Sequence, residues 1–493
     1  MLFRNQIPAC QGYIDSADDR RILGWVWDRR NPRRRLDVHI YAAGCFLGAV
    51  RADSFRADLV GENIGDGHYG FSFELPPGEF PDETVAAKVA GHDYWLLDGS
   101  GRAGADQPRD GFLNSARRGW PLLRPALSQR QADETDIEIA AALQRQWHAA
   151  GGAAAASKFA GPKSMWGRIV ATRHRSLADL LDRPDAGSLA AYLVSLQRLP
   201  ESDGITQGEA AYRDFIAASD GGRRAAVAPF HDMLASLAQY LGLERAECDE
   251  QDFVGATLAL DQAELAAKIE AALGHGIAPP TVFDGLYGLA LGDRVLHGRD
   301  IQALYAALRA IEAADTPTPV ICEVGGGFGQ VAHYAWLRGV RRYTIVDLPT
   351  VCAMQYYYLR KTLPGVRVTF REPSEPPDAS DGIDLVFASR VHEGLRMRGD
   401  IVLNCDSFPE MGEAICAQYF ALLPDWAPLL LSVNQEANRP GYSRRDRQIV
   451  VGELLPKYGF ARRYRFRSWI RPGYVEELWQ SRANGRLGTI GAG

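Results

Sequence analysis

The chain has 493 residues, of which 46% are hydrophobic and 24% charged, and its formal net charge at pH 7 is −6. This length exceeds one ordinary hydrophobic core, so two or three globular domains are expected. The negative charge argues against a dedicated nucleic-acid binder, because such proteins are usually basic.

The seven cysteines are scattered and form no Cys-x-x-Cys pair, so they predict neither a disulfide framework nor a zinc site. Met1–Gly12 lacks the apolar core of a secretory signal. No segment reaches the roughly 18 apolar residues of a transmembrane helix. We therefore expect a cytoplasmic protein without a transmembrane segment, and the sequence leaves a homo-oligomer open.

Residues 1–101 are predicted to form an all-β sandwich, which would be an accessory module. Short apolar runs such as ILGWVWD, LDVHIYAAG and GFSFEL alternate with turn-forming residues at Asn31-Pro32 and Gly65-Asp66-Gly67. We expect its aromatic residues to fill the core, although exposed ones could stack on sugar rings.

A linker is predicted over residues 102–132, which are rich in Gly, Arg, Asp and Pro, and a helical region over residues 133–314. In DQAELAAKIEAALG, Asp261 can cap the N-terminus of a helix and Gly274 can end it. The run DIQALYAALRAIEAA repeats this pattern, with Asp300 as the predicted N-cap.

Thr281–Arg299, which lies between these two helices, is dense in glycine. It lies just before the predicted nucleotide-binding unit, one helix ahead of its first strand. It could therefore fold over a cofactor as a lid, or it could be a plain helix–helix connection. Both alternatives stay open.

From Val320 on, predicted strands alternate with predicted helices. This alternation is typical of an α/β, doubly wound parallel sheet with helices on both faces, which we assign to residues 315–493. Strands are expected at VICEV, YTIVD, VRVTF, IDLVFA, DIVLNC and PLLLSV, and helices at Gln330–Arg338, Thr350–Thr362, Gly412–Leu422 and Ser443–Tyr458. The last two runs, RRYRFRSW and YVEELWQS, could form an antiparallel hairpin at one edge.

The glycine-rich turn after the first of these strands admits two cofactors. Gly327–Ala332 reads G-x-G-x-x-A, which is one form of the dinucleotide fingerprint. Glu323 stands two residues before Gly325, where a carboxylate would repel a pyrophosphate and attract an ammonium or sulfonium group. Asp347, at the end of the next strand, suits the ribose hydroxyls of either cofactor. The pattern favours S-adenosyl-L-methionine over NAD.

Four segments, EVGGGFG, YTIVDLP, IVLNCDSFPEM and LSVNQEANRP, resemble in this order a bacterial family of sugar O-methyltransferases. The resemblance implies a class I, Rossmann-like methyltransferase fold. It also implies an S-adenosylmethionine-dependent enzyme that methylates a sugar hydroxyl in polysaccharide or glycoconjugate biosynthesis. The acceptor would be a sugar or glycan, free or linked to a nucleotide or a lipid. GWVWD and IGDGHYGF resemble a β-sandwich module found beside bacterial glycan-processing enzymes.

The glycine-rich turn, the second strand and two later loops are expected to hold the cofactor. The loop after IDLVFA would line the adenine. The predicted cofactor-binding residues are Glu323, Gly325, Gly326, Gly327, Phe328, Gly329, Asp347, Leu348, Ser389 and Asn404.

Methyl transfer to a hydroxyl requires a general base that removes the hydroxyl proton. Asp406 and Glu410 follow the strand DIVLNC, at the sheet edge where such folds bind ligands. Asp406 could equally cap the helix that follows it, and both roles stay open. His392 is the alternative base, since imidazole titrates near neutrality.

Acceptor contacts are expected in the loops after the fourth and fifth strands. The predicted acceptor-binding residues are Ser407, Gln435, Glu436, Asn438 and Arg444. Arg444 belongs to an arginine cluster that could hold the phosphate of a linked sugar. Asp406, Glu410 and Glu436 offer carboxylates for a divalent cation, but their spacing does not demand one, and no metal is assigned.

Two other functions stay open on the sequence alone. The Gly327–Ala332 fingerprint would suit an NAD-dependent oxidoreductase acting on a nucleotide sugar. A non-catalytic scaffold for glycan assembly would use the β module for docking.

Overall fold

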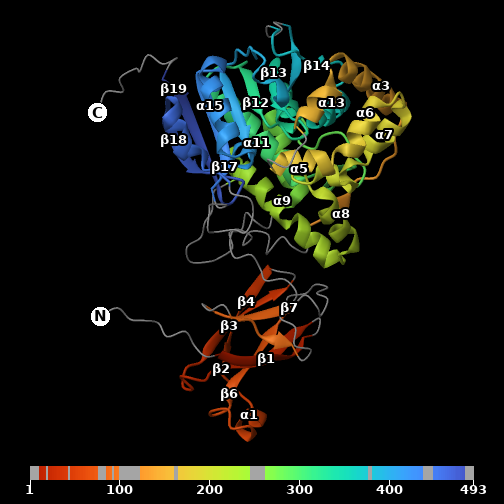
Figure 1. Ribbon diagram of the computed structural model, residues 1–493. Helices are drawn as coiled ribbons and strands as arrows, with labels where there is room; N and C mark the ends of the chain where they lie inside the picture. The colour runs from red at the N-terminus through yellow and green to blue at the C-terminus, as the bar shows by residue number, and fades with distance from the viewer. Residues whose placement is uncertain are drawn as a thin grey trace. The chain divides into compact units, whose positions relative to one another are not determined.

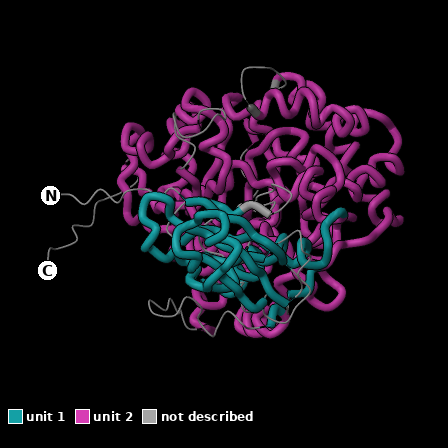
Figure 2. Tube along the Cα trace, turned by 90° about the horizontal axis from the view of Figure 1, so that it is seen from below, with its two compact units in different colours: residues 1–125, 217–235, 245–262 teal, residues 126–216, 236–244, 263–493 magenta. Residues whose placement is uncertain are grey.

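The computed structural model describes most of the chain, in ten segments. These are residues 10–17, 20–42, 45–75, 85–90, 94–98, 123–159, 165–244, 261–375, 380–436 and 448–482. The chain forms two compact units (Figure 2). Unit 1 comprises residues 1–125, 217–235 and 245–262, and unit 2 comprises residues 126–216, 236–244 and 263–493.

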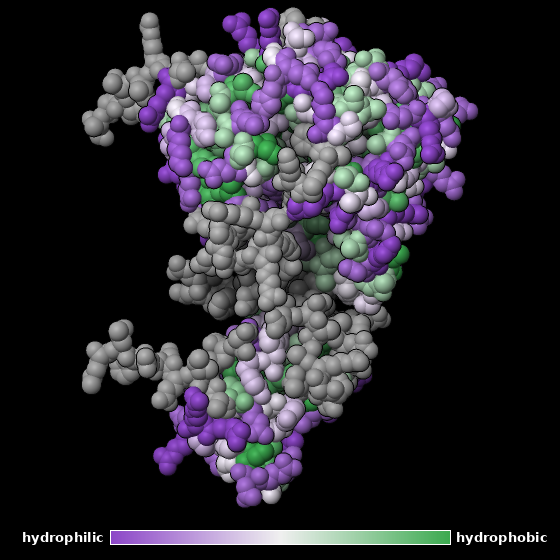
Figure 3. Space-filling view, viewed as in Figure 1, coloured by the Kyte–Doolittle hydropathy of each residue, from purple (hydrophilic) through white to green (hydrophobic). Residues whose placement is uncertain are grey.

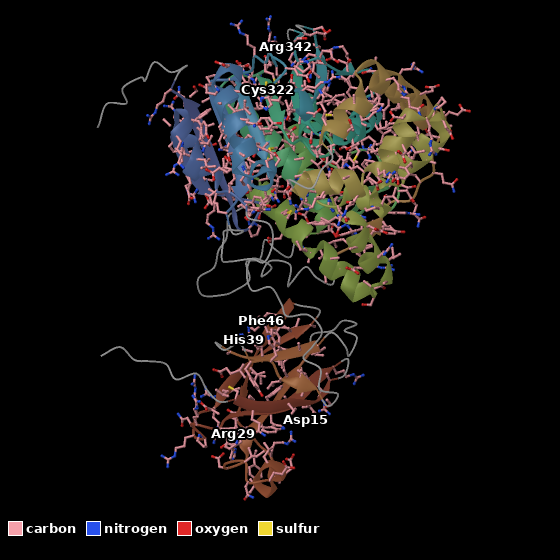
Figure 4. The ribbon with its side chains drawn as sticks, in the orientation of Figure 1. Asp15, Arg29, His39, Phe46, Cys322 and Arg342 are labelled. Atoms are coloured by element: carbon pink, nitrogen blue, oxygen red, sulfur yellow. The ribbon has the colours of Figure 1, made fainter. Side chains whose placement is uncertain are left out.

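The first part of unit 1 consists of two small sheets (Figure 1). Its elements are β1 (Cys10–Ala17), β2 (Arg21–Asp28), β3 (Leu36–Ala42), β4 (Cys45–Ala52), β5 (Ser54–Phe55), α1 (Ala57–Gly61), β6 (His68–Glu74), β7 (Val85–Val89) and β8 (Leu97–Asp98). The strand orders are β5-β6-β2-β1-β8 and β4-β3-β7. Both sheets contribute to one buried cluster, since Ile22 and Val26 from β2 join Val38 and Ile40 from β3. His39 and Phe46 lie together on β3 and β4, with ring centroids 4.9 Å apart (Figure 4).

The predicted helical region is helical along most of its described length. Its helices are α3 (Glu134–Ala149), α4 (Gly152–Phe159), α5 (Met165–Thr172), α6 (Arg175–Asp182), α7 (Ala186–Val194), α8 (Gly208–Ala217), α9 (Asp220–Tyr240), α10 (Gln262–Leu273) and α11 (Gly298–Ala314). The bounds of α10 agree with the predicted end at Gly274, whose φ is +76°.

The predicted N-cap of α11 is wrong by three residues. The cap is His297, whose side chain accepts a hydrogen bond from the N–H of Arg299 at 3.0 Å. Asp300 stands at the third helical position and accepts from the N–H of His297 at 3.1 Å. The acid therefore supplies the returning half of a capping box.

Thr281–Arg299 is not a plain helix–helix connection, because it contains the antiparallel strands β10 (Tyr287–Leu291) and β11 (Arg294–Leu296). Gly292 turns the chain between them with a φ of +62°, a conformation that favours glycine. The hairpin leads directly into His297 and α11.

An eight-stranded sheet forms the centre of unit 2, in the order β14-β15-β13-β12-β16-β17-β19-β18 (Figure 1). Its strands are β12 (Val320–Val324), β13 (Arg342–Asp347), β14 (Val368–Phe370), β15 (Gly382–Phe387), β16 (Ile401–Cys405), β17 (Leu429–Gln435), β18 (Phe460–Arg467) and β19 (Tyr474–Ser481). The first six are parallel in their pairings, whereas β19 runs antiparallel to both β17 and β18. These strands agree with the predicted α/β sheet.

Helices cover both faces of this sheet. On one face, α13 (Pro349–Thr362) packs on β13, β14 and β15, while α11 packs on β16, β17 and α12 (Gln330–Leu337). On the other face, α15 (Glu413–Trp426) buries Phe420 against Cys322 and Val324 of β12. Figure 4 shows Cys322 within the sheet.

The predicted helix Ser443–Tyr458 is confirmed only in part of its described residues, which begin at residue 448. Two short elements occupy it, α16 (Val451–Leu454) and a 3₁₀ turn (Leu455–Tyr458). Pro456 lies in the first turn of the second element, where its missing N–H leaves no gap in hydrogen bonding.

The order of the strands fixes where a ligand can bind. From β12 the chain moves outward to β13 and then to β14 at the edge of the sheet, and β15 inserts between these two. The chain then crosses to β16 on the other side of β12 and continues to β17. Such a reversal opens a crevice at the carboxyl ends of the two central strands. The candidate site is therefore expected beyond Val324 and Cys405.

None of the helices in the described segments combines the length and the apolar character that a membrane crossing needs. Hydrophilic side chains cover much of the face of unit 2 that Figure 3 shows.

Candidate active site

A cavity opens at this reversal, beyond the carboxyl ends of β12, β13 and β16. Its lining includes Trp166, Ile205, Arg299, Gln302, Glu323, Gly325, Gly326, Gly327, Asp347, Leu348, Val351, Ala388, Asp406, Ser407, Glu410, Met411, Tyr419, Ser468 and Arg471. The cavity thus brings together six of the predicted cofactor-binding residues, the candidate bases Asp406 and Glu410, and the predicted acceptor-binding residue Ser407.

The glycine-rich turn passes close to the loop that follows β16. Gly325 has a φ of +77°, and a Cβ there would lie 2.2 Å from the Oγ of Ser407. A Cβ on Gly326 would lie 2.9 Å from Oε2 of Glu323 and 2.8 Å from Cγ2 of Ile345. Side chains at either position would push the turn away from the strands, so the sequence needs glycine here.

Asp347 holds this turn in place from the end of β13. Its Oδ2 accepts hydrogen bonds from the N–H of Gly326 at 2.9 Å and from Nε2 of Gln355 at 2.7 Å. Its Oδ1 accepts from the N–H of Leu348 at 2.7 Å. A carboxylate offers about four acceptor positions, so these three bonds leave capacity for a ligand hydroxyl.

Glu323 is almost fully buried at the base of the cavity, with 1% of its surface exposed. Tyr343 OH donates a hydrogen bond to its Oε2 at 2.9 Å. Burial raises the pKa of Glu323 to about 8, with Asp347 adding to the rise and the Tyr343 bond opposing it. Burial also raises the pKa of Asp347 to about 7. A cation bound beside Glu323 and Asp347 would stabilise the ionised forms that burial disfavours. The two acids therefore provide a favourable environment for a cation.

Asp406 lies between two arginines. Its Oδ2 accepts from Nη1 of Arg299 at 2.8 Å and from Nη1 of Arg471 at 2.6 Å. Burial acts to raise the pKa of Asp406, but Arg471 and Arg299 outweigh it and hold that pKa well below its ordinary value. A carboxylate stabilised so strongly in its ionised form is a poor proton acceptor.

The alternative role of Asp406, as a helix cap, is wrong for its side chain. Asp406 stands at the N-cap of α14 (Ser407–Met411), but its carboxylate makes no capping hydrogen bond. The two arginines engage the carboxylate instead, because charge-assisted bonds are stronger than a bond to a neutral amide. Its φ of +69° is an uncommon conformation for an aspartate.

Glu410 projects into the same cavity from α14. Nε1 of Trp166, on α5, donates a hydrogen bond to its Oε2 at 2.9 Å. Burial raises the pKa of Glu410 to about 7, against the lowering effect of the Trp166 bond. A carboxyl group that titrates near neutrality can accept a proton at physiological pH.

His392 is exposed and bonds to Oε1 of Gln418 through its Nε2 at 2.8 Å, away from the residues that line the cavity. The structure therefore contradicts its placement as the alternative base. Ala388 contributes to the cavity lining, whereas the predicted adenine contact Ser389 does not line it.

Three further predicted cofactor residues support the cavity from outside its lining. Phe328 is fully buried and packs on Phe283, with ring centroids 4.8 Å apart. Gly329 is the N-cap of α12, with a φ of +87°. Nδ2 of Asn404 donates to the carbonyl of Val324 at 2.9 Å and ties β16 to the end of β12. The buried side chains of Phe328 and Asn404 and the backbone of Gly329 therefore position the turn.

The loop after β17 does not reach the cavity with its described residues. Gln435 bonds to Gln448. Both oxygens of Glu436 accept from Arg465 at 2.8 Å. Neither residue lines the cavity, so the acceptor contacts expected at these two positions stay predictions. Asn438 and Arg444 lie outside the described residues.

The sequence did not point to Trp166, Arg299, Arg471 or Tyr419 as cavity residues. Arg299 is the last residue of the glycine-dense segment Thr281–Arg299, and that position was the only sequence signal for any of the four. Trp166 belongs to a helix 244 residues before its partner Glu410, and no motif marks it. Among the described residues, no group of three or more His, Cys, Asp or Glu side chains is placed to hold a metal ion.

No protein-family model and no curated protein sequence matches the chain. Three of the solved structures that match it are described as methylases or methyltransferases. A ribosomal protein methylase from Lactobacillus delbrueckii subsp. bulgaricus is 12% identical, with 37% of this chain and 79% of that chain covered at a TM-score of 0.26. The glycopeptide N-methyltransferase MtfA, complexed with sinefungin, is 16% identical, with coverages of 36% and 94% and a TM-score of 0.28.

A third match is coclaurine N-methyltransferase bound to N-methylheliamine and SAH, which is 12% identical, with coverages of 34% and 50% and a TM-score of 0.24. Likenesses at these identities and TM-scores carry no weight for the activity of this chain. The resemblance to sugar O-methyltransferases stays a prediction, and the residues of the cavity support the function proposed below.

Proposed function

We propose that this chain is an S-adenosyl-L-methionine-dependent O-methyltransferase that methylates a hydroxyl of a sugar or glycan, in polysaccharide or glycoconjugate biosynthesis. One observation carries this proposal. A single cavity combines buried acids at a glycine turn, Glu323 and Asp347, with a carboxyl group that titrates near neutrality, Glu410. The first two suit a cationic nucleoside, and the third suits the removal of a proton.

The donor set fits S-adenosylmethionine better than a dinucleotide. A pyrophosphate beside Glu323 would meet a carboxyl group whose ionised form repels it. The ammonium and sulfonium groups of S-adenosylmethionine would instead stabilise that ionised form. Asp347 would accept a hydrogen bond from a ribose hydroxyl, and Leu348, Val351 and Ala388 offer an apolar wall for a base.

The cofactor would supply an electrophilic methyl group attached to sulfur. Glu410 would accept the proton of the acceptor hydroxyl as the acceptor oxygen bonds to the methyl carbon. The electrons of the broken carbon–sulfur bond would remain on sulfur, so charge is conserved. Trp166 would hold the Glu410 carboxylate through its indole N–H, and the aromatic face of its ring would exclude water.

We also propose the domain division and the role of the N-terminal strands. Residues 1–101 would be a β-sandwich accessory module, residues 102–132 a linker, residues 133–314 a helical region and residues 315–493 the methyltransferase domain with its antiparallel edge hairpin. The shared core of the two small sheets supports the sandwich. A module of this kind would bring the enzyme to its glycan substrates.

Calorimetric titration with S-adenosylhomocysteine tests the cofactor. We expect binding by the wild-type protein and at least about tenfold weaker binding by Asp347→Asn, because one charge-assisted hydrogen bond is worth about 1.5–3 kcal/mol. Asp425→Asn on α15 is the control, because Asp425 does not line the cavity. Binding of NAD without binding of S-adenosylhomocysteine would overturn the proposal in favour of an oxidoreductase.

A further inference from the structure

Arg299 and Arg471 meet at a single carboxylate inside the cavity. Both guanidinium groups donate to the same oxygen of Asp406, Oδ2, at 2.8 and 2.6 Å. Their side chains are 27% and 13% exposed, and that of Asp406 is 23% exposed. Two positive charges thus share one negative charge in a largely desolvated place. A buried charge that lacks a full counter-charge favours an anionic ligand.

The two arginines are held by different parts of the chain. Arg299 lies in the first turn of α11, where its Nη1 also donates to Oε1 of Gln302 at 3.3 Å. Arg471 lies in the turn between β18 and β19, with its guanidinium carbon 3.5 Å from the centroid of the Tyr474 ring. This stacking fixes the plane of the guanidinium group and leaves its edge for hydrogen bonding.

The pair lies on the Glu410 side of the cavity. Arg299 and Arg471 both act on the pKa of Glu410, after burial, the Trp166 bond and Asp406. The pKa of Glu323 responds instead to burial, Tyr343 and Asp347. Asp406, to which both guanidinium groups donate, is the N-cap residue of the helix α14 that carries Glu410, so the pair lies beside the proposed base.

We infer that Arg299 and Arg471 form a binding site for a carboxylate, which an acidic sugar acceptor such as a uronic acid supplies. The inference rests on the proposed function and narrows its acceptor. A guanidinium edge matches a carboxylate with two parallel hydrogen bonds, so a sugar acid would be oriented with a defined hydroxyl toward Glu410. The aminoacyl end of the cofactor is the other source of a carboxylate in this cavity.

Two pairs of ligands distinguish an acceptor carboxylate from the cofactor carboxylate, because one member of each pair has a carboxylate that the other lacks. Glucuronate and glucose test the acceptor, and they are titrated with and without S-adenosylhomocysteine. S-adenosylhomocysteine and 5′-methylthioadenosine test the cofactor, because the second lacks the aminoacyl group. We compare the wild-type protein with Arg471→Gln and Arg299→Gln, using Arg342→Gln as the control. Arg342 is exposed at the amino-terminal end of β13 (Figure 4), whereas the cavity lies at the carboxyl end of that strand.

We expect the wild-type protein to prefer glucuronate over glucose, and both cavity variants to lose about tenfold or more of that preference. If the variants instead keep the preference for glucuronate and lose the preference for S-adenosylhomocysteine over 5′-methylthioadenosine, the arginines bind the carboxylate of the cofactor. Variants that retain both preferences would overturn the inference while leaving the proposed function intact.

Failure of the wild-type protein to bind either nucleoside would overturn the proposed function. Even then, titration with glucuronate in the absence of a nucleoside tests whether the arginine pair binds a carboxylate. Equal affinity of the wild-type protein for glucuronate and glucose would show that it does not. Because Arg299 is more exposed than Arg471, Arg299→Gln provides a second reading if Arg471→Gln fails to fold.

Discussion

The indole Nε1 of Trp166 donates a hydrogen bond to Oε2 of Glu410 at 2.9 Å. The bond joins helix α5 to the short helix α14, 244 residues later in the chain. Because the bond favours the ionised carboxylate, it opposes the rise in the pKa of Glu410 that burial causes. Trp166 therefore adjusts the basicity of the group proposed to remove the acceptor proton.

Trp166→Phe should shift the pH dependence of kcat/KM. The base must be ionised, so activity rises with pH through the pKa of Glu410, which is about 7. Loss of the indole donor removes the hydrogen bond that opposes the burial effect and leaves only Arg299 and Arg471 to lower the pKa, so the midpoint should move upward by about one pH unit. Trp336→Phe is the control, since Trp336 lies at the far end of α12 and does not line the cavity. An unchanged midpoint would remove Trp166 from this role.

Glu410→Gln should lower kcat about a hundred- to ten-thousand-fold, because general-base catalysis typically contributes that much. Binding of S-adenosylhomocysteine should persist, since Glu323 and Asp347 are untouched. Glu413→Gln is a matched control, because Glu413 is exposed at the start of α15. If Glu410→Gln retains wild-type kcat, the base lies elsewhere, and single-turnover measurements would confirm that result.

Glu323→Gln should remove much of the pH dependence of cofactor binding. In the wild-type protein a cationic ligand favours ionised Glu323, whose pKa without the ligand is about 8. Affinity should therefore rise with pH up to about 8, by as much as tenfold per unit, with release of a proton on binding. The variant should bind more weakly, and its remaining rise should end near pH 7, where Asp347 titrates. Calorimetry in buffers of different ionisation enthalpy counts the released protons.

The raised pKa of Glu323 also has a consequence for stability. A folded-state pKa of about 8 lies above the ordinary value of 4.5, so the folded protein holds a proton that the unfolded chain has lost. The free energy of unfolding should fall as pH rises from about 5 to 8. The fall should be smaller in Glu323→Gln, as measured by urea unfolding at both pH values. An equal fall in the two proteins would contradict the assigned burial effect.

Gly326→Ala should destabilise the fold by about 1–3 kcal/mol, because its methyl group would press on both Ile345 and Glu323. Gly187→Ala on α7 is the control. Its nearest neighbour would be Oδ1 of Asp185 at 3.6 Å, an ordinary contact, so the change should be neutral or slightly stabilising. Equal melting temperatures for the two variants would show that the glycine turn has more room than the structure gives it.

The strands of the α/β sheet and the glycine turn with its two neighbouring acids could be predicted from sequence because their signals are local. Glu323, the glycines and Asp347 lie within one strand–turn–helix–strand segment, and hydrophobic runs mark the strands around them. The acceptor side depends on tertiary contacts that no local pattern encodes. Asp406 follows a strand and precedes a helix, as a cap or base would, but Arg299 and Arg471 are 107 and 65 residues away in sequence and decide its state.

The same reasoning accounts for His392 and for α11. Imidazole chemistry alone suggested a base at His392, whereas the turn after β15 exposes it beside Gln418. Asp300 was predicted as the N-cap because aspartate is common at that position. Aspartate also suits the third helical position, where its side chain accepts a hydrogen bond from the N–H of the N-cap residue, here His297.

The walls of the cavity have separate origins along the chain. Glu323, the glycine turn and Asp347 come from one continuous segment, whereas Trp166 and Arg299 come from the preceding helices and Arg471 from the last pair of strands. Under the proposed function, chimeras that exchange residues 126–314 with those of another methyltransferase should therefore change the acceptor while the affinity for the methyl donor stays nearly constant. Evolution of new acceptors would then proceed without rebuilding the donor pocket.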